Sequence, residues 1–313
     1  MNDGSHNAGV QDFVVAIDFG GTKVAVATAN MTGTLLKQAR IDTHASRGAK
    51  QILERTTIAA QELIERTAAE TKGRCVAGGV TTPGVVQENG ILLSPNIPGW
   101  EQVPLRETMR ASLNIPIVTA GNDVKAAAMA EFLWGALKKA DPAVFLSLGT
   151  GIAAAIVIGG RVVNGAHNAS GEIGYNLRSV MDHLGAAHGR APLEEVLGGR
   201  FIGEQGSLLL EESLSAADVF AHSDMRARFL VDEVLAELAT HVANLAILID
   251  PACIAVGGGL MSSGAVILRA LAFRLNYAVP FPPKIVPARF LNDASLYGAI
   301  ALALMGFEDA SSK

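Results

Sequence analysis

Residues 13–27 decide the fold and read Phe-Val-Val-Ala-Ile-Asp-Phe-Gly-Gly-Thr-Lys-Val-Ala-Val-Ala. Two apolar runs flank a polar centre, which is typical of a strand, a tight turn at Gly20 and Gly21, and a returning strand. Backbone N–H groups in such a turn bind anions together with the Thr22 hydroxyl and the Lys23 ammonium, and glycine admits a phosphate because it has no Cβ. The turn predicts a nucleotide clamp, and a hairpin with a chance Gly-Gly turn is the alternative interpretation.

Asp18 lies at the end of the first strand, where its carboxylate would face bound phosphate. Two anionic groups in that position need a divalent cation between them. We therefore expect Asp18 to hold a magnesium ion through water, together with the nucleotide.

Composition narrows the class of protein. The chain has 313 residues, of which 50% are hydrophobic, 5% are aromatic and 33 are glycine, a mix that suits a two-lobed α/β protein. A net charge of −5 without a Lys/Arg run argues against nucleic-acid or anionic-membrane partners. Cys75 and Cys253 lie in apolar surroundings and are expected to be buried thiols. With no signal peptide at the start and no apolar run long enough for a bilayer, we expect a soluble, cytoplasmic protein.

The opening pattern returns at residues 143–158, where Gly149-Thr150-Gly151 forms the turn. A helix is expected after each hairpin, over residues 51–72 and 226–249, and then a short strand, over 76–81 and 253–256. The second of these strands runs into the glycines 257–259, where a backbone can approach a ligand closely. This internal repeat predicts a duplicated α/β domain with a cleft between the copies.

The remaining elements are assigned by turn signals and periodicity. Strands are expected over residues 35–43 and 115–120, and a helix over 122–137 with Asp123 as its N-cap. Residues 165–206 form a polar, glycine-rich insertion. A final helix should pack on the first lobe, so residues 1–121 with 293–313 form the N-terminal lobe and 122–292 the C-terminal lobe.

With these motifs in order, the chain resembles the ROK family of sugar kinases and sugar-responsive repressors, within the actin-like ATPase (ribonuclease H-like) superfold. The resemblance runs from Phe13 to about Leu304. Each motif is short, but seven of them stand in the family's order. They are Asp18-Phe-Gly-Gly-Thr-Lys23, Pro83-Gly84, Pro95-Asn96 with Trp100, Asn122-Asp123 with Glu131, Gly149-Thr-Gly151, Gly171-Glu-Ile-Gly174 and Gly257-Gly-Gly259.

The resemblance implies two lobes that close on ATP and a hexose, with ATP and magnesium required for the reaction. Residues implied in nucleotide binding are Gly20, Gly21, Thr22 and Lys23 on one side of the phosphates, Thr150 and Gly151 on the other, and Gly258 and Gly259 under the adenosine. Residues implied in sugar binding are Gly84, Asn96, Asn122, Asp123, Glu172, Tyr175 and Glu194.

Asp123 is the predicted general base, since a sugar hydroxyl that attacks phosphorus must lose its proton to a nearby carboxylate. A plain helix N-cap is the alternative role. Asn96 has an alternative role as a turn residue, and Glu194 as a solvated helix start. Glu131, inside the following helix, is expected to be structural.

One part of the family pattern is missing. Members that bind zinc use a histidine and three cysteines at positions that are Tyr175, Gly185, Ala187 and Pro192 here, so a Cys₃His zinc site cannot form. His183 and His188 are too few ligands for a replacement metal site. We expect packing of Leu184, Leu193 and Val196 to hold this segment instead. Tyr175 also leaves open which substituents are recognised on the C1–C2 side of the sugar, because a phenol and an imidazole differ in reach.

The first functional hypothesis is an ATP-dependent hexose kinase, most simply one that acts on the 6-hydroxyl of glucose. An amino or modified hexose (an N-acetylhexosamine or 3-amino-glucose), fructose and mannose are alternative substrates. A sugar-sensing repressor is disfavoured because only twelve residues precede Phe13, too few for a helix-turn-helix domain. An actin-like ATPase or scaffold would not need the sugar-binding set. We further expect a homodimer.

Overall fold

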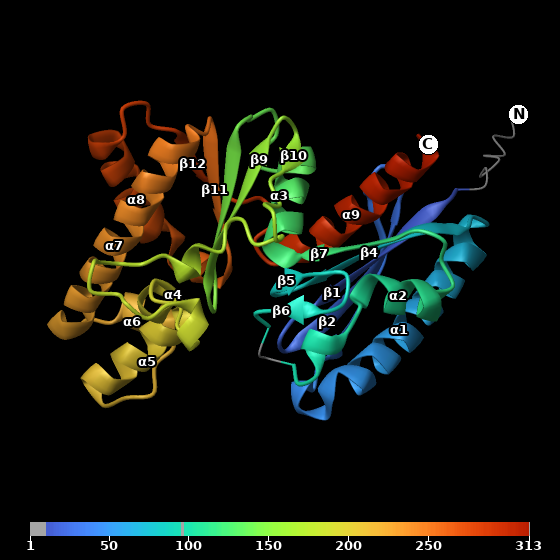
Figure 1. Cartoon of the computed structure of the whole chain (residues 1–313), viewed down its shortest axis with the longest axis horizontal. Helices are drawn as coiled ribbons and strands as arrows, with labels where there is room; N and C mark the ends of the chain where they lie inside the picture. Colours follow the sequence, from blue (N-terminus) through green and yellow to red (C-terminus); the bar gives the residue numbers. More distant parts are fainter. Residues whose placement is uncertain (1–10, 95–96, 313) are drawn as a thin grey trace, which may run out of the picture. The chain divides into compact units, whose positions relative to one another are not determined.

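The computed structural model describes residues 11–94 and 97–312 (Figure 1). Two compact units divide the chain: the first runs to Ala130 and takes in the segment from Ser295 onward, and the second holds Glu131–Ala294. Each unit is built on a five-stranded sheet. Within the described ranges, no helix combines the length and the apolar character that a bilayer crossing requires.

The sheet of the first unit has the strand order β3-β2-β1-β4-β7. Antiparallel pairing joins β1 to β2 and β2 to β3, whereas β4 runs parallel to both β1 and β7. Six of the seven residues of β1 are buried, because both faces of the central strands are covered. The strands are β1 (Phe13–Phe19), β2 (Lys23–Asn30), β3 (Leu35–Asp42), β4 (Cys75–Thr82) and β7 (Val118–Asn122), and a small hairpin pairs β5 (Val85–Val86) with β6 (Ile91–Leu92).

Helices cover both faces of this sheet (Figure 1). On one face, α1 (Gly48–Thr71) and α2 (Leu105–Leu113) share a core with β1. On the other face, α9 (Ala294–Ser311) lies so close to β4 that a Cβ on Gly79 would sit 1.8 Å from the carbonyl oxygen of Ala299. The last described helix of the chain therefore packs against the sheet of the first unit.

The sheet of the second unit repeats this plan in the order β10-β9-β8-β11-β12. Its first three strands are again antiparallel neighbours, and β11 is again parallel to β8 and β12. The repeated topology confirms the predicted duplicated α/β architecture. The strands are β8 (Ala143–Leu148), β9 (Ile152–Ile158), β10 (Arg161–Val162), β11 (Cys253–Gly257) and β12 (Lys284–Pro287).

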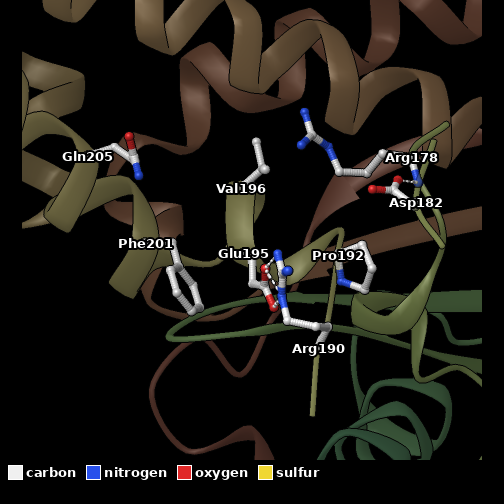
Figure 2. Close-up of a pocket in the computed structure, with 8 residues that line it drawn as sticks. All are labelled: Arg178, Asp182, Arg190, Pro192, Glu195, Val196, Phe201 and Gln205. Atoms are coloured by element: carbon white, nitrogen blue, oxygen red, sulfur yellow. Dashed lines mark hydrogen bonds and ion pairs between the residues drawn. The ribbon is translucent and has the colours of Figure 1, made fainter. Parts of the chain in front are cut away.

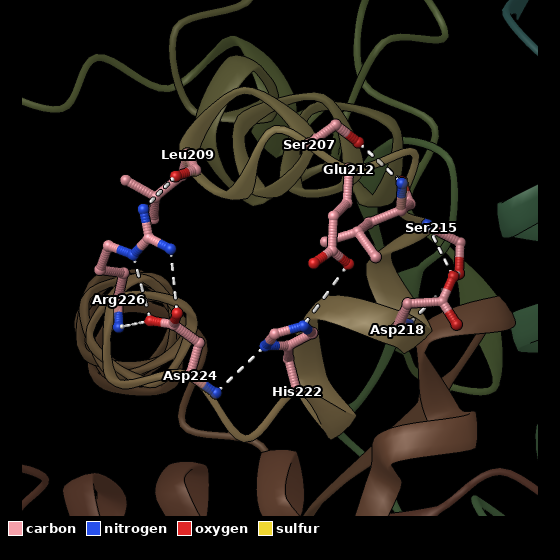
Figure 3. Close-up of polar contacts among 9 residues, drawn as sticks. Ser207, Leu209, Glu212, Ser215, Asp218, His222, Asp224 and Arg226 are labelled. Atoms are coloured by element: carbon pink, nitrogen blue, oxygen red, sulfur yellow. Dashed lines mark hydrogen bonds and ion pairs between the residues drawn. The ribbon is translucent and has the colours of Figure 1, made fainter.

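The helices α7 (Met225–Ile249) and α8 (Gly264–Ala278) pack together and share an apolar core with β8 and β11. Three shorter helices precede them: α4 (Glu194–Leu197), α5 (Gly199–Leu210) and α6 (Ala216–Ala221). Side-chain caps fix the corner that joins these helices (Figure 3). Ser215 and Asp218 form a reciprocal capping box on α6, and Asp224 caps α7 through the backbone N–H of Arg226.

Most predicted elements are present with small changes at their ends. Several helices were not expected from the sequence, among them α2 and α5, which begins within the supposed insertion over residues 165–206. The glycines of α5 mask its periodicity, yet Ile202 lies in the core of the second unit and Leu210 is buried. Both helices are stabilised by tertiary packing more than by their local sequence.

Candidate active site

The first glycine turn joins β1 to β2, and hydrogen bonds within the turn and from Thr43 hold its backbone. The N–H of Gly20 donates to the carbonyl of Lys23 (3.0 Å), and the hydroxyl and N–H of Thr43 bind the carbonyls of Gly20 (2.7 Å) and Thr22 (2.8 Å). A Cβ on Gly20 would lie 2.7 Å from the Lys23 carbonyl oxygen, whereas one on Gly21 would meet nothing within 4 Å. The turn thus has a fixed inner side and exposes residues 21–23.

Asp18 lies at the end of β1, half-buried, directly before this turn. Thr81 of β4 donates its hydroxyl hydrogen to the Asp18 carboxylate over 2.9 Å. A carboxylate oriented by a neighbouring hydroxyl is a hard oxygen ligand, so the donor set fits a magnesium ion held through water. The contribution of Thr81 was missed from the sequence, although a threonine pair that ends a buried strand before Pro83-Gly84 was a usable signal.

Asn122 and Asp123 stand where β7 passes into α3 (Asp123–Trp134). The side-chain oxygen of Asn122 accepts the N–H of Lys125 (3.0 Å), so Asn122 caps the helix and the expectation that Asp123 is the N-cap was wrong. Asp123 is already the first helical residue, and its carboxylate accepts the N–H of Val124 (2.9 Å). The amide of Asn122 also donates to the carbonyl of Gly84 (2.9 Å).

These contacts gather three predicted sugar-site residues, Gly84, Asn122 and Asp123, in the first unit. Burial raises the pKa of the Asp123 carboxyl, and the N–H of Val124 offsets part of this effect. The φ of Gly84 is +96°, a conformation that only glycine adopts readily. A partly buried carboxylate with a raised pKa beside a fixed amide is suited to taking a proton from a bound hydroxyl.

Trp100 lies in the segment before α2 and supports it. The predicted sugar ligand Asn96 lies outside the described residues. The Trp100 side chain is fully buried, donates its indole N–H to the Thr82 hydroxyl (2.9 Å), and meets the ring of Phe19 edge-on at 5.1 Å. One side chain therefore links this loop to the strand ends beside Asp18 and Gly84.

The second glycine turn, Gly149-Thr150-Gly151, joins β8 to β9. The N–H of Gly149 donates to the Gly151 carbonyl (2.9 Å), as in a tight turn. The strand β11 brings Gly258 and Gly259 close to it: a Cβ on Gly258 would lie 2.3 Å from the Leu148 carbonyl oxygen, and the Gly259 nitrogen is 3.9 Å from the ideal Cβ position of Gly149. The structure therefore places the glycines predicted to lie under the adenosine next to the second glycine turn.

Three further predicted sugar ligands gather in the second unit. Glu194, the first residue of α4, accepts the N–H of Ile152 over 3.0 Å. The segment that carries Glu172 and Tyr175 is tied to the same place, because the Leu193 N–H donates to the Gly174 carbonyl (3.1 Å). The pKa of the Tyr175 phenol is raised by burial first and then by the negative charges of Glu194 and Glu172. The three side chains form one polar cluster.

A sequence model of the ROK family matches residues 14–305 of this chain. The chain belongs to the ROK family. The glucokinase of Halalkalibacterium halodurans is 26% identical over 290 residues, covering 85% of this chain and 86% of that protein. The N-acetylmannosamine kinase of Escherichia coli strain SE11 is 25% identical over 295 residues, covering 92% of this chain and 97% of that protein.

The solved structure of a ROK hexokinase from Thermus thermophilus is similar to this ROK protein with a TM-score of 0.80 and 27% identity, over 95% of this chain and 99% of that chain. The likeness confirms the predicted fold class, the actin-like ATPase form of duplicated α/β domain. Fold alone does not fix a substrate, so the chemistry must be argued from the site.

The segment that holds the replaced zinc-ligand positions contains an ion pair between Arg190 and Glu195, which Figure 2 shows. The Arg190 guanidinium donates to both carboxylate oxygens of Glu195. The Arg178 guanidinium likewise donates to both carboxylate oxygens of Glu237 in α7. The pKa of the Glu195 carboxyl is lowered by its bond to Arg190. In the ranges that the structure covers, no three His, Cys, Asp or Glu side chains are grouped as metal ligands would be.

The predicted apolar contacts of this segment are correct only in part. Leu193 is fully buried and Val196 packs against the core, but the side chain of Leu184 is 48% exposed and cannot hold the segment. The sequence showed the charged residues but not their pairing, because Arg178 and Glu237 are far apart in the chain and meet only through the tertiary fold.

Proposed function

We propose that this ROK protein transfers the γ-phosphoryl group of ATP to a hexose hydroxyl, most simply the 6-hydroxyl of glucose or a related sugar. The observation that carries the proposal is the arrangement at the start of α3. Asp123 has a raised pKa there, and the adjacent Asn122 amide is fixed by Gly84 and by the helix cap. This places a stronger base than an ordinary aspartate beside a group that pairs with hydroxyls.

In the proposed step, Asp123 takes the proton from the attacking hydroxyl while that oxygen forms a bond to the γ-phosphorus. The bond between the γ-phosphorus and the β–γ bridging oxygen breaks, and ADP leaves with the electron pair. Positioning and charge stabilisation supply most of the rate enhancement in such transfers. The fixed contacts of Asn122 supply the positioning.

Two glycine turns would bind the phosphates in this proposal. The exposed turn of Gly20, Gly21, Thr22 and Lys23 donates from one unit and Thr150 with Gly151 from the other, while Gly258 and Gly259 pass under the adenosine. Asp18, oriented by Thr81, would hold magnesium through water. That ion, when bound, offsets the negative charge of the phosphates.

For the sugar we propose Gly84, Asn122, Asp123, Glu172, Tyr175 and Glu194 as contacts, with Asn96 as a further ligand. Carboxylates and amides pair with vicinal hydroxyls, so a site of this kind rejects analogues that lack one. Relatives named as a glucokinase and as an N-acetylmannosamine kinase support both glucose and N-acetylated hexosamines as substrates. Tyr175 favours an amino or otherwise modified hexose, such as 3-amino-glucose, and fructose and mannose stay alternative substrates.

We further propose that the protein is a cytoplasmic homodimer without structural zinc and without nucleic-acid or membrane partners. We propose residues 1–121 with 293–313 as one functional lobe of each subunit and residues 122–292 as the other. Metal analysis of the purified protein tests the zinc proposal, and stoichiometric zinc would contradict it. Light scattering tests the dimer, and limited proteolysis tests the lobe boundaries.

A coupled ADP-release assay over a panel of hexoses and aminohexoses tests the function. We expect ADP release that requires one class of sugar. The panel should include glucose, mannose, fructose, glucosamine, N-acetylglucosamine, N-acetylmannosamine and 3-amino-glucose. Sugar binding without any sugar-dependent ADP release would refute the kinase and favour a sugar-sensing, repressor-like protein. Equal ATP hydrolysis with and without every sugar would instead favour an ATPase or scaffold.

A further inference from the structure

The backbone a few residues after Glu194 donates hydrogen bonds to the second glycine turn, Gly149-Thr150-Gly151, which is the proposed second phosphate turn. The N–H of Gly199 donates to the Gly149 carbonyl over 2.8 Å, and the N–H of Arg200 donates to the Thr150 carbonyl over 3.3 Å. A Cβ on Gly198 would lie 2.8 Å from the Thr150 carbonyl oxygen, so the approach requires glycine. The turn and the junction of α4 with α5 are therefore one hydrogen-bonded unit.

The Glu194 side chain adds a contact of its own. Its Oε2 atom accepts the N–H of Ile152, the residue that directly follows the turn, over 3.0 Å. The position is open to a carboxylate only because Gly151 has no side chain: a Cβ there would lie 2.1 Å from Oε2. Within the described residues no hydrogen bond reaches the other oxygen, Oε1, and the side chain is half-buried.

We propose that Glu194 couples sugar binding to phosphate binding. This rests on the proposed function, in which Oε1 of Glu194 accepts a sugar hydroxyl. A hydroxyl on Oε1 restricts the rotation of the whole carboxylate, and Oε2 then restricts the N–H of Ile152 and the phosphate turn beside it. A nucleotide that binds the ordered turn meets a smaller entropy cost, so each ligand raises the affinity for the other by the same factor.

The neighbouring Glu195 provides a matched control on the same helix. Its carboxylate accepts the N–H of Ala191 (3.0 Å) and the Arg190 guanidinium, and it makes no contact with the turn among the interactions of the described residues. A Glu195→Gln variant changes the same atoms one residue away from the proposed link.

The experiment measures the dissociation constant of a non-hydrolysable ATP analogue by calorimetry, with and without a saturating sugar from the panel. In the wild type we expect the sugar to tighten analogue binding about fivefold or more. Glu194→Ala should bind sugar weakly and lose this gain, whereas Glu194→Gln should weaken sugar binding but keep the gain within about twofold, because its amide oxygen still accepts the Ile152 N–H. Glu195→Gln should behave as wild type.

If Glu194→Ala fails to fold, Glu194→Asp gives the same test, since a side chain one methylene shorter cannot reach Ile152. An undiminished gain in either variant would overturn the coupling proposal while leaving the kinase intact. A wild type without any gain would do the same. Sugar affinity unchanged in Glu194→Ala would instead refute the assignment of Glu194 as a sugar ligand in the proposed function.

Discussion

The substitution Asp123→Asn should make the protein much less active without making it less stable. Asparagine has nearly the same shape, and its side-chain oxygen can still accept the N–H of Val124. Helix α3 keeps its cap because Asn122, not Asp123, binds the N–H of Lys125. What the variant loses is the carboxylate that accepts a proton.

General base catalysis contributes about 10²- to 10⁴-fold to a rate. Loss of the Asp123 base should therefore raise the activation free energy by about 3–5 kcal/mol, at roughly 1.4 kcal/mol per tenfold change. The measurement is kcat from coupled ADP release at saturating ATP and sugar. Sugar affinity, measured by calorimetry, should change far less, because the amide of asparagine still occupies the site.

Asp123→Asn lowers kcat, but it should not lower the free energy of unfolding. Burial raises the pKa of Asp123, so the folded state favours the neutral carboxyl and bears a cost once the group ionises. That cost is absent below the unfolded pKa of about 3.9 and is fully present above the raised folded pKa. Near neutral pH the variant should therefore be as stable as the wild type or more stable, and the difference should vanish in acid. In the pH profile of the wild-type kcat, the midpoint of the acid limb should lie above the pKa of an ordinary aspartate.

The control is Asp250→Asn, an exposed residue with φ of +52° after α7, where asparagine is well tolerated. It should change neither kcat nor the unfolding midpoint. Turnover of Asp123→Asn within about tenfold of wild type with the best sugar would refute the base assignment, because a general base contributes more than that. A loss of activity that parallels a loss of stability would show that Asp123 is structural.

Substitutions at three other positions test the supports of the site, chiefly by urea unfolding. Glu131 is fully buried and accepts two backbone N–H groups, so Glu131→Ala should cost about 3–6 kcal/mol and Glu131→Gln about half as much; a loss below 1 kcal/mol would contradict this. Trp100→Phe removes only the indole donor to Thr82 and should cost about 1–2 kcal/mol while raising the KM for sugar; an unchanged KM would separate Trp100 from the site. Gly79→Ala puts a methyl group 1.8 Å from the Ala299 carbonyl oxygen and should cost about 3 kcal/mol or more; near-neutral behaviour would show that α9 is displaced easily.

Local sequence was sufficient for the repeated parts of the fold. The apolar runs around Gly20 and Gly149 predicted both hairpins, and periodicity predicted α1 and α7 within a few residues. Such elements are readable because strand and helix periods and glycine turns are properties of neighbouring residues. The same local reasoning missed α5, whose glycines lower its helix propensity and whose stability comes from packing.

Roles that depend on contacts between distant residues were decided only by the tertiary structure. The sequence determined that Asn122, Asp123 and Glu194 are polar groups in a kinase-like pattern. It could not determine that the amide of Asn122 donates to the carbonyl of Gly84, 38 positions earlier, or that Glu194 reaches the N–H of Ile152, 42 positions earlier in the chain. A hydrogen bond requires two groups to meet within about 3 Å, and folding alone decides which groups meet across such separations.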